Sequence, residues 1–194
     1  MKVIHADSTD IERFFKEQGR RVLTFLGYSG SGYEHPAAML AHAGSVLDEF
    51  KPQDTLVNIG GTPDGIGAIY ELAQRRGFMT TGIVSALAHE TGMPLSPFAD
   101  VVFFVADASW GGQLPGSTQL SPTSQAIVEH SDVIVAIGGG AIARDELEAA
   151  LRAGKAVRFI AAEMNHAAAV AAAARKGLPP PTDFGGAAAE RFAA

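Results

Sequence analysis

The chain has 194 residues, of which 47% are hydrophobic and 19% charged, and this composition predicts one well-packed domain rather than a disordered chain. It contains no cysteine, which excludes disulfides, a thiol nucleophile and thiolate metal sites. Its formal net charge of -6, without a run of basic residues, predicts that nucleic acid is not a partner.

Short β-branched runs alternate with helix-length segments through most of the chain. After a helical extension over 1–20, with its helix at 7–18, strands are expected at 21–27, 54–61, 78–85, 100–107, 132–137 and 156–161. Helices are expected at 36–50, 64–76, 122–130, 143–153 and 164–176. This alternation is typical of a parallel sheet with helices on both faces. It predicts a single domain over 1–194, a three-layer Rossmann-like α/β fold with an open parallel sheet of about six strands.

The last residues, 178–194, are rich in proline, glycine and alanine, and we expect either a packed-down extension or a loose tail. The first ten residues, MKVIHADSTD, lack the apolar run of a secretory signal. The apolar run AAAVAAAA at 167–174 is much shorter than the ~18–20 residues that cross a bilayer. We therefore expect a cytoplasmic protein that does not bind membranes.

Three of the expected strands end in loops of small residues, GYSGSG at 27–32, GGTPDG at 60–65 and GGGA at 138–141. In an open α/β sheet, ligands bind at the carboxyl ends of the strands, near the point where the strand order reverses. Glycine lets the backbone approach a ligand, and a following helix N-terminus offers N–H groups to phosphate. The alternative is that these glycines only make tight turns. The predicted phosphate or nucleotide contacts are Gly27, Ser29, Gly30, Ser31, Gly60, Gly61, Thr62, Gly65, Gly138, Gly139 and Gly140.

Two adjacent acids, Asp145 and Glu146, follow the third loop. Glu146 is the candidate catalytic residue, because a carboxylate there could polarise a ribose hydroxyl or a water beside a glycosidic bond. The alternative for both residues is structural, since acids are favoured in the first turn of a helix by its dipole.

Two further segments carry candidate ligand contacts. In SPTSQ, Ser121 is expected to cap a helix that begins at Pro122, and Thr123 is a ligand contact or simply part of that helix. Trp110 lies in the glycine-rich loop SWGGQLPGS. It is expected either to stack on a base or to seal a small core of the loop itself.

The segment SDVIVAIGGGAIARDELEAAL resembles the PGGxGTxxE signature of the LOG-like (lysine-decarboxylase-like) proteins, which include cytokinin-activating phosphoribohydrolases. Gly139 and Gly140 match its glycine pair and Glu146 matches its glutamate. LVNIGGTPDGIG resembles the second glycine loop, GGGxxGLMG, and VLTFLGYSGSGYEHPAAML resembles the first strand and its loop. The wider SLOG superfamily, with molybdenum-cofactor-carrier-like and nucleotide-sensing members, is equally similar. The resemblance covers about 21–160 and implies a Rossmann-like fold that binds nucleotides.

The resemblance is incomplete at the signature. Gly138, Ile142 and Ala143 stand where the signature has Pro, Gly and Thr. The hydrolytic LOG-like proteins also share an arginine before this motif, whereas this chain has none between Arg76 and Arg144. The resemblance therefore implies a non-catalytic sensor or carrier of a nucleotide or phosphoribosyl compound. A nucleoside 5′-monophosphate phosphoribohydrolase that uses Glu146 is the alternative, with hydrolysis expected to be weak or absent.

A second alternative comes from the same loop. Gly138, Gly140 and Ala143 match the G-x-G-x-x-A dinucleotide fingerprint, and Glu163 lies at the spacing of a ribose-binding acid of an NAD-type site. The six histidines show no metal-site spacing, so no metal and no resident cofactor are expected. The weakly charged helices at 36–50 and near His166 predict a homodimer or a higher homo-oligomer.

Overall fold

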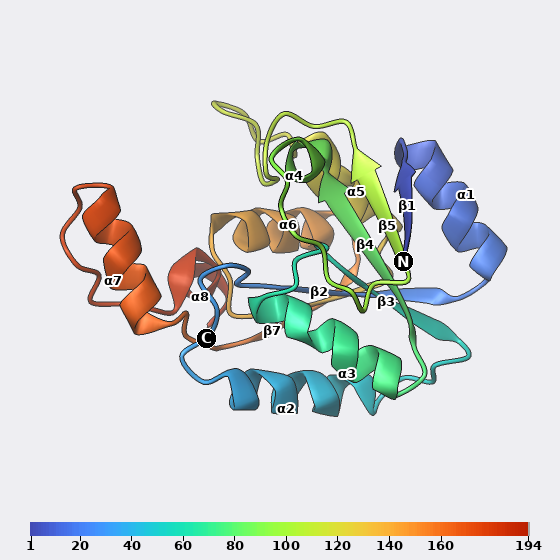
Figure 1. Ribbon diagram of the computed structural model, residues 1–194, viewed down its shortest axis with the longest axis horizontal. Coiled ribbons are helices and arrows are strands. Elements are labelled where there is room, and N and C mark those ends of the chain that lie inside the picture. Colours follow the sequence, from blue (N-terminus) through green and yellow to red (C-terminus); the bar gives the residue numbers. More distant parts are fainter. Residues whose placement is uncertain (194) are drawn as a thin grey trace.

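Seven parallel strands form one open sheet in the order β1-β5-β4-β3-β2-β6-β7 (Figure 1). In the computed structural model, which describes residues 1–193, the strands are β1 (Lys2–His5), β2 (Arg21–Gly27), β3 (Thr55–Ile59), β4 (Met79–Ser85), β5 (Val101–Val105), β6 (Val133–Ile137) and β7 (Ala156–Ile160). The predicted parallel sheet is confirmed, with one strand more than expected. β1 was missed because it is a four-residue edge strand with mostly exposed side chains, so it carries no apolar run.

The helices follow the predicted order, with three differences. They are α1 (Ser8–Gln18), α2 (Pro36–Leu47), the 3₁₀ helix η1 (Gly65–Ala68), α3 (Ile69–Arg75), α4 (Ala86–Glu90), α5 (Pro122–His130), α6 (Ala141–Arg152), α7 (His166–Arg175) and α8 (Gly186–Phe192). The helix predicted at 64–76 is divided into η1 and α3, and α4 and α8 were not predicted. No helix within residues 1–193 has the length and apolar character needed to cross a membrane.

Helix boundaries follow from capping residues. The Asp7 side chain accepts a hydrogen bond from the Asp10 backbone N–H, and α1 ends at Gly19 in the left-handed conformation. Ser121 caps α5, with Pro122 at the first helical position as predicted. These local signals explain why α1 and α5 begin close to the predicted positions.

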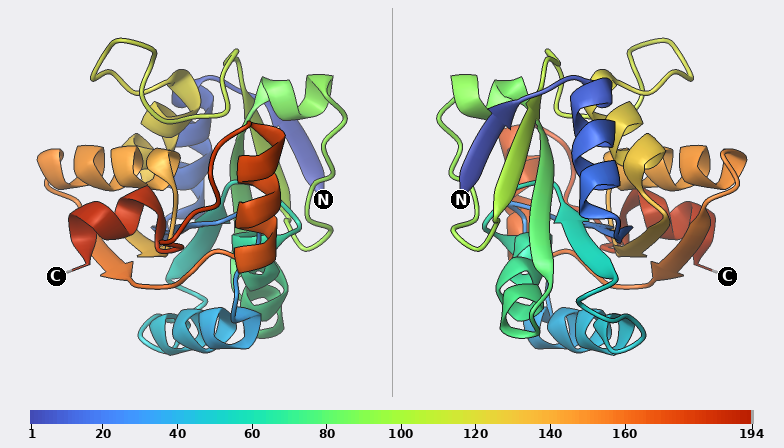
Figure 2. Two further views of the ribbon diagram at one scale, coloured as in Figure 1. Left: turned by 90° about the vertical axis from the view of Figure 1, so that its left-hand side faces the viewer. Right: turned by 90° about the vertical axis from the view of Figure 1, so that its right-hand side faces the viewer.

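The helices cover the sheet on both faces, which gives the predicted three layers (Figures 1 and 2). Leu23 and Phe25 of β2 pack in a cluster with α2 and α3, whereas Val22 and Leu26 pack in a second cluster with α1, α5 and α6. This alternation along one strand is the period of two expected for a strand that is buried on both faces.

The C-terminal segment is a packed-down extension. The backbone N–H of Ala188 in α8 donates to the Gly139 carbonyl at 3.1 Å, and the Tyr28 hydroxyl donates to the Gly185 carbonyl at 2.6 Å. Ala188 is fully buried. By contrast, α7 stands out from the edge of the sheet (Figure 1), and Ala169 is its one buried residue.

Candidate functional site

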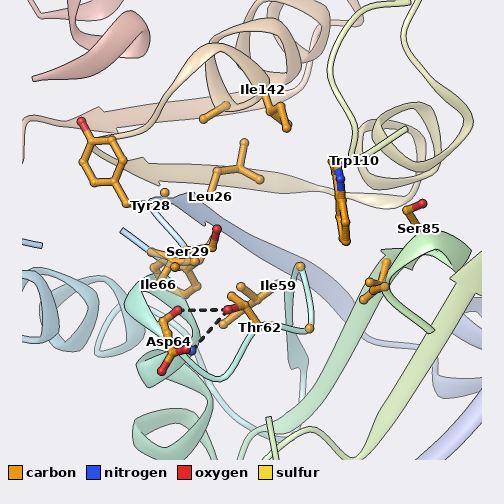
Figure 3. A pocket seen from close by; sticks show the side chains of 18 of the residues that line it. Leu26, Tyr28, Ser29, Ile59, Thr62, Asp64, Ile66, Ser85, Trp110 and Ile142 are labelled. Carbon is orange, nitrogen blue, oxygen red and sulfur yellow. Dashed lines mark hydrogen bonds between the residues drawn. The ribbon is translucent and has the colours of Figure 1, made fainter. Parts of the chain in front are cut away.

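A cavity of about 650 Å³ lies at the carboxyl ends of the central strands (Figure 3). Its walls include the segments that follow β2, β3 and β4 and the start of α6. β3 and β6 flank β2 in the sheet, so the strand order reverses at β2. The cavity therefore occupies the position at which open α/β sheets bind ligands, and its volume is in the range of small-molecule sites.

Most of the predicted contact residues line this cavity, but three do not. Those that line it are Gly27, Ser29, Gly30, Ser31, Gly60, Gly61, Thr62, Thr123, Gly140 and Glu146. Gly65, Gly138 and Gly139 are not among the lining residues. They have φ angles of 59°, 60° and 135°, and a Cβ on any of them would collide with neighbouring atoms. These three residues serve the turns, as in the alternative interpretation.

Three other glycines have no such structural requirement. Gly30, Gly60 and Gly140 lack a positive φ, and no atom lies within 4 Å of the place where their Cβ would stand. They are the only glycines within residues 1–193 with both properties, and each comes from a different one of the three predicted loops. The missing side chains therefore leave open space along the wall of the cavity.

The start of α6 adds hydrogen-bond donors to the same wall. Gly140 is the N-cap of α6 and has no side chain to accept from the first-turn N–H groups. Gly140, Ala141, Ile142 and Ala143 all line the cavity. The first-turn N–H groups of a helix lack partners within the helix and carry a partial positive charge, so an anionic group is favoured here.

Glu146 lines the cavity and is only 3% exposed. Its Oε1 accepts from the Ser124 hydroxyl at 2.6 Å, and Ser124 Oγ accepts from the Gly112 backbone N–H at 2.7 Å. Burial raises the pKa of Glu146 to about 7, against the opposing effect of the Ser124 hydrogen bond. Glu146 thus both faces the cavity and holds the loop that contains Gly112.

Asp145 holds the same loop from the neighbouring position. Its Oδ2 accepts from the Gln113 backbone N–H at 3.0 Å, and its Oδ1 accepts from Arg144 Nη2 at 2.8 Å. Neither Asp145 nor Arg144 lines the cavity. Asp145 therefore contacts the loop rather than the cavity, and Arg144 is not placed to act as the missing arginine of the hydrolytic LOG-like proteins.

Thr123 contributes a polar atom without a partner. It is 4% exposed and lines the cavity, and within residues 1–193 its hydroxyl makes no hydrogen bond. Its backbone N–H donates to Asp107 at 2.9 Å. Burial tends to raise the pKa of Asp107, but hydrogen bonds from the backbone N–H groups of Thr123 and Ser109 and from the Ser109 hydroxyl outweigh it and lower that pKa. The Thr123 hydroxyl oxygen is buried as well as unpaired, so a contact between Thr123 and a ligand stays a prediction.

Trp110 and a set of apolar residues complete the cavity. Trp110 is 52% exposed and its indole extends over the cavity, between Ile142 and Ser85 and across from Ser29 and Thr62 (Figure 3). Since its ring is open to the cavity, it does not seal a core of its own loop.

The cavity is also lined by residues that were not predicted from the sequence, which include Asp64, Ser85, Met93, Leu95 and Met164.

Within residues 1–193, the carboxyl groups of the lining are those of Asp64 and Glu146, and no Lys, Arg or His lines it. A phosphate would therefore be held by backbone N–H groups and hydroxyls. Glu163, the acid proposed for an NAD-type site, pairs with His166 at 2.8 Å and does not line the cavity. This position does not favour the dinucleotide alternative.

No protein-family model matches this chain, and no curated protein matches it in sequence. Among solved structures, the molybdenum cofactor binding protein from Rippkaea orientalis matches with a TM-score of 0.53 and 17% identity, over 72% of this chain and 76% of that one. The molybdenum cofactor carrier protein from Chlamydomonas reinhardtii matches with a TM-score of 0.52 and 19% identity, over 72% and 76%. The predicted Rossmann-like α/β fold is thereby confirmed.

Proposed function

We propose that this protein binds a nucleotide or a related phosphoribosyl compound at the carboxyl edge of its sheet, as a carrier or sensor. The observation that carries the proposal is the convergence of Gly30, Gly60 and Gly140 on one cavity without any conformational need for glycine. A glycine lowers the stability of the folded protein unless the fold needs its conformation or its lack of a side chain. Beside Gly30, Gly60 and Gly140 the missing side chain leaves room in the cavity, where a ligand could use it. The N-terminus of α6 supplies donors for a phosphate at the same wall.

Two observations support a carrier or sensor rather than a hydrolase. Glu146 is held by Ser124, and Arg144, the nearest arginine, is paired with Asp145 outside the cavity. Hydrolysis of an N-glycosidic bond develops charge that a fixed guanidinium would stabilise, and losing such a contact typically costs ~3 kcal/mol, about a hundredfold in rate. The solved structures with this fold include proteins described as carrying or binding the molybdenum cofactor, which is consistent with a carrier.

The hydrolase alternative has one observation in its favour. Glu146 lines the cavity with a pKa raised to about 7, which suits a general acid or base near neutral pH. Incubation with adenosine 5′-monophosphate (AMP) is expected to release little or no adenine. Turnover of several per second in the wild type that disappears in Glu146→Ala would replace the carrier proposal by this alternative.

Binding is tested with 5′-nucleoside monophosphates at up to millimolar concentration. We expect at least one of them to raise the melting temperature and to change the fluorescence of Trp110, the one tryptophan of the chain. In Gly140→Ala the new methyl group projects into the cavity, so affinity should fall about tenfold or more, equivalent to ~1.4 kcal/mol. Isothermal titration calorimetry measures this change.

The matched control is Gly44→Ala, a glycine of ordinary φ in α2 that lies outside the cavity lining. Its Cβ would meet only the end of the flexible Arg76 side chain, at 3.0 Å. This variant should bind as the wild type does. The proposal would be wrong if no monophosphate bound, or if Gly140→Ala and Gly44→Ala had the same affinity as the wild type.

A further inference from the structure

Trp110 is presented to the cavity as an open aromatic face. It is 52% exposed, although tryptophan is on average highly buried, and it lines the cavity. The aromatic ring pairs found within residues 1–193 do not include it. In Figure 3 its ring stands between Ile142 and Ser85, and the space in front of it is the cavity. The indole is therefore available to a ligand rather than to the protein core.

The loop that carries Trp110 is held by hydrogen bonds from the backbone N–H groups of Gly112 and Gln113. The Gly112 N–H donates to Ser124, whose hydroxyl donates to Glu146, and the Gln113 N–H donates to Asp145 at 3.0 Å. Gly111 and Gly112 have positive φ, and a Cβ on either would come within 3.3 Å of Ile142 side-chain atoms. The loop thus lies tightly on the start of α6, where Asp145 holds it directly and Glu146 holds it through Ser124.

A rigid loop with a free indole is suited to one kind of ligand group. Planar heterocycles stack on tryptophan, and a pre-positioned ring loses little conformational freedom when it binds. The backbone donors at Gly140–Ala143 line the same cavity as Trp110, so a phosphate at the helix and a ring at the indole can belong to one molecule.

We infer that Trp110 is the stacking platform for the planar ring of the ligand, and that Asp145 is a positioning residue that holds this platform over the cavity. The inference rests on the proposed function and narrows it. The site selects compounds that join a heterocyclic ring to a phosphorylated sugar, and it discriminates against the sugar phosphate alone.

Calorimetry with AMP and with ribose 5-phosphate tests this selection. Base–aromatic stacking predicts that the wild type binds AMP about tenfold more tightly than ribose 5-phosphate. Trp110→Ala should bind AMP about tenfold more weakly while its affinity for ribose 5-phosphate is unchanged. Trp110→Phe, which keeps an aromatic face, should retain most of the preference for AMP.

Asp145→Ala tests the positioning role, and Arg144→Ala is its control. Removing Asp145 leaves the Gln113 N–H without its acceptor, so the loop that carries Trp110 should become more mobile and the fluorescence anisotropy of Trp110 should fall. The affinity for AMP should then fall several-fold, whereas the affinity for ribose 5-phosphate should stay the same. Arg144→Ala removes the half-buried ionic partner of Asp145 but keeps the bond to Gln113, so it should behave as the wild type. A purely structural Asp145 would weaken both compounds equally, which would contradict its positioning role.

The outcomes separate the two proposals. If AMP binds equally well to the wild type and to Trp110→Ala, or if AMP and ribose 5-phosphate bind equally to the wild type, the stacking inference is wrong while the proposed function stands. If neither compound binds the wild type, the proposed function fails and the inference fails with it.

Discussion

At the scale of single residues, Glu146 combines burial with an ionisable group. It is 3% exposed, and its pKa is raised to about 7 because burial disfavours the carboxylate, with a smaller contribution from the nearby charge of Asp145. In the unfolded chain the same carboxyl has a pKa near 4.5. Between these two values the folded protein holds a proton that the unfolded chain has lost.

This difference predicts how stability depends on pH. The contribution of Glu146 is fully present below pH 4.5 and is lost as the pH rises to about 7, because ionisation then favours the unfolded chain. Glu146→Gln cannot ionise but can still accept from Ser124. At pH 8 it should therefore be more stable than the wild type by up to about 3 kcal/mol, and the difference should shrink towards pH 4.5.

Urea unfolding of both proteins at pH 5 and pH 8 measures this dependence. The difference between the two proteins isolates Glu146, since the other titrating groups are common to both. A stability difference that is the same at both pH values would show that Glu146 has an ordinary pKa in the folded protein.

At the scale of elements, the turn from β6 to α6 shows what three consecutive glycines do. Gly138 and Gly139 have positive φ and are surrounded by atoms, with Tyr28 Cε2 at 2.5 Å and the Ala162 carbonyl at 2.7 Å from a Cβ on Gly138. Gly140 has φ -86° and open space. The letters GGG predicted a close turn into a helix, and this was right. The separate roles were not predictable, because they depend on Tyr28 and Ala162, which are distant in sequence.

The separate roles predict opposite mutational behaviour within one turn. Gly138→Ala should lower the free energy of unfolding by about 2 kcal/mol or more. An alanine there would have to adopt the left-handed backbone conformation, and its Cβ would collide with Tyr28 and with the Ala162 carbonyl. Gly140→Ala should change the free energy of unfolding by less than about 1 kcal/mol. Alanine is a poorer N-cap than glycine, but it also lowers the conformational entropy of the unfolded chain, and the two effects oppose each other. Urea unfolding measures both, and equal losses would contradict the assignment.

At the scale of the whole molecule, six of the seven strands were predictable and their order was not. Buried parallel strands read as continuous apolar runs, which is why β2 was placed correctly, and Pro122 and Ser121 fixed the start of α5. The order β3-β2-β6 depends on pairings between residues far apart in the chain, and this order brings the three glycine loops together. For the same reason Ser85 and Met164, from other parts of the chain, could not be recognised as lining the cavity.

Self-association stays a prediction at this scale, and the structure gives it a physical basis. α7 has ten residues, one of them buried, and Val170 on its surface is 41% exposed. An isolated helix of this length is marginal in water, so contact with a second copy would stabilise it.

Light scattering at micromolar concentration should give twice the chain mass of 20.2 kDa. Val170→Glu should reduce this mass, because it would place a charge in a helix–helix contact, whereas Leu151→Glu, at an exposed position of α6, should not. A mass of 20.2 kDa for the wild type would exclude the dimer, and α7 would then be expected to exchange its amide hydrogens faster than the central strands.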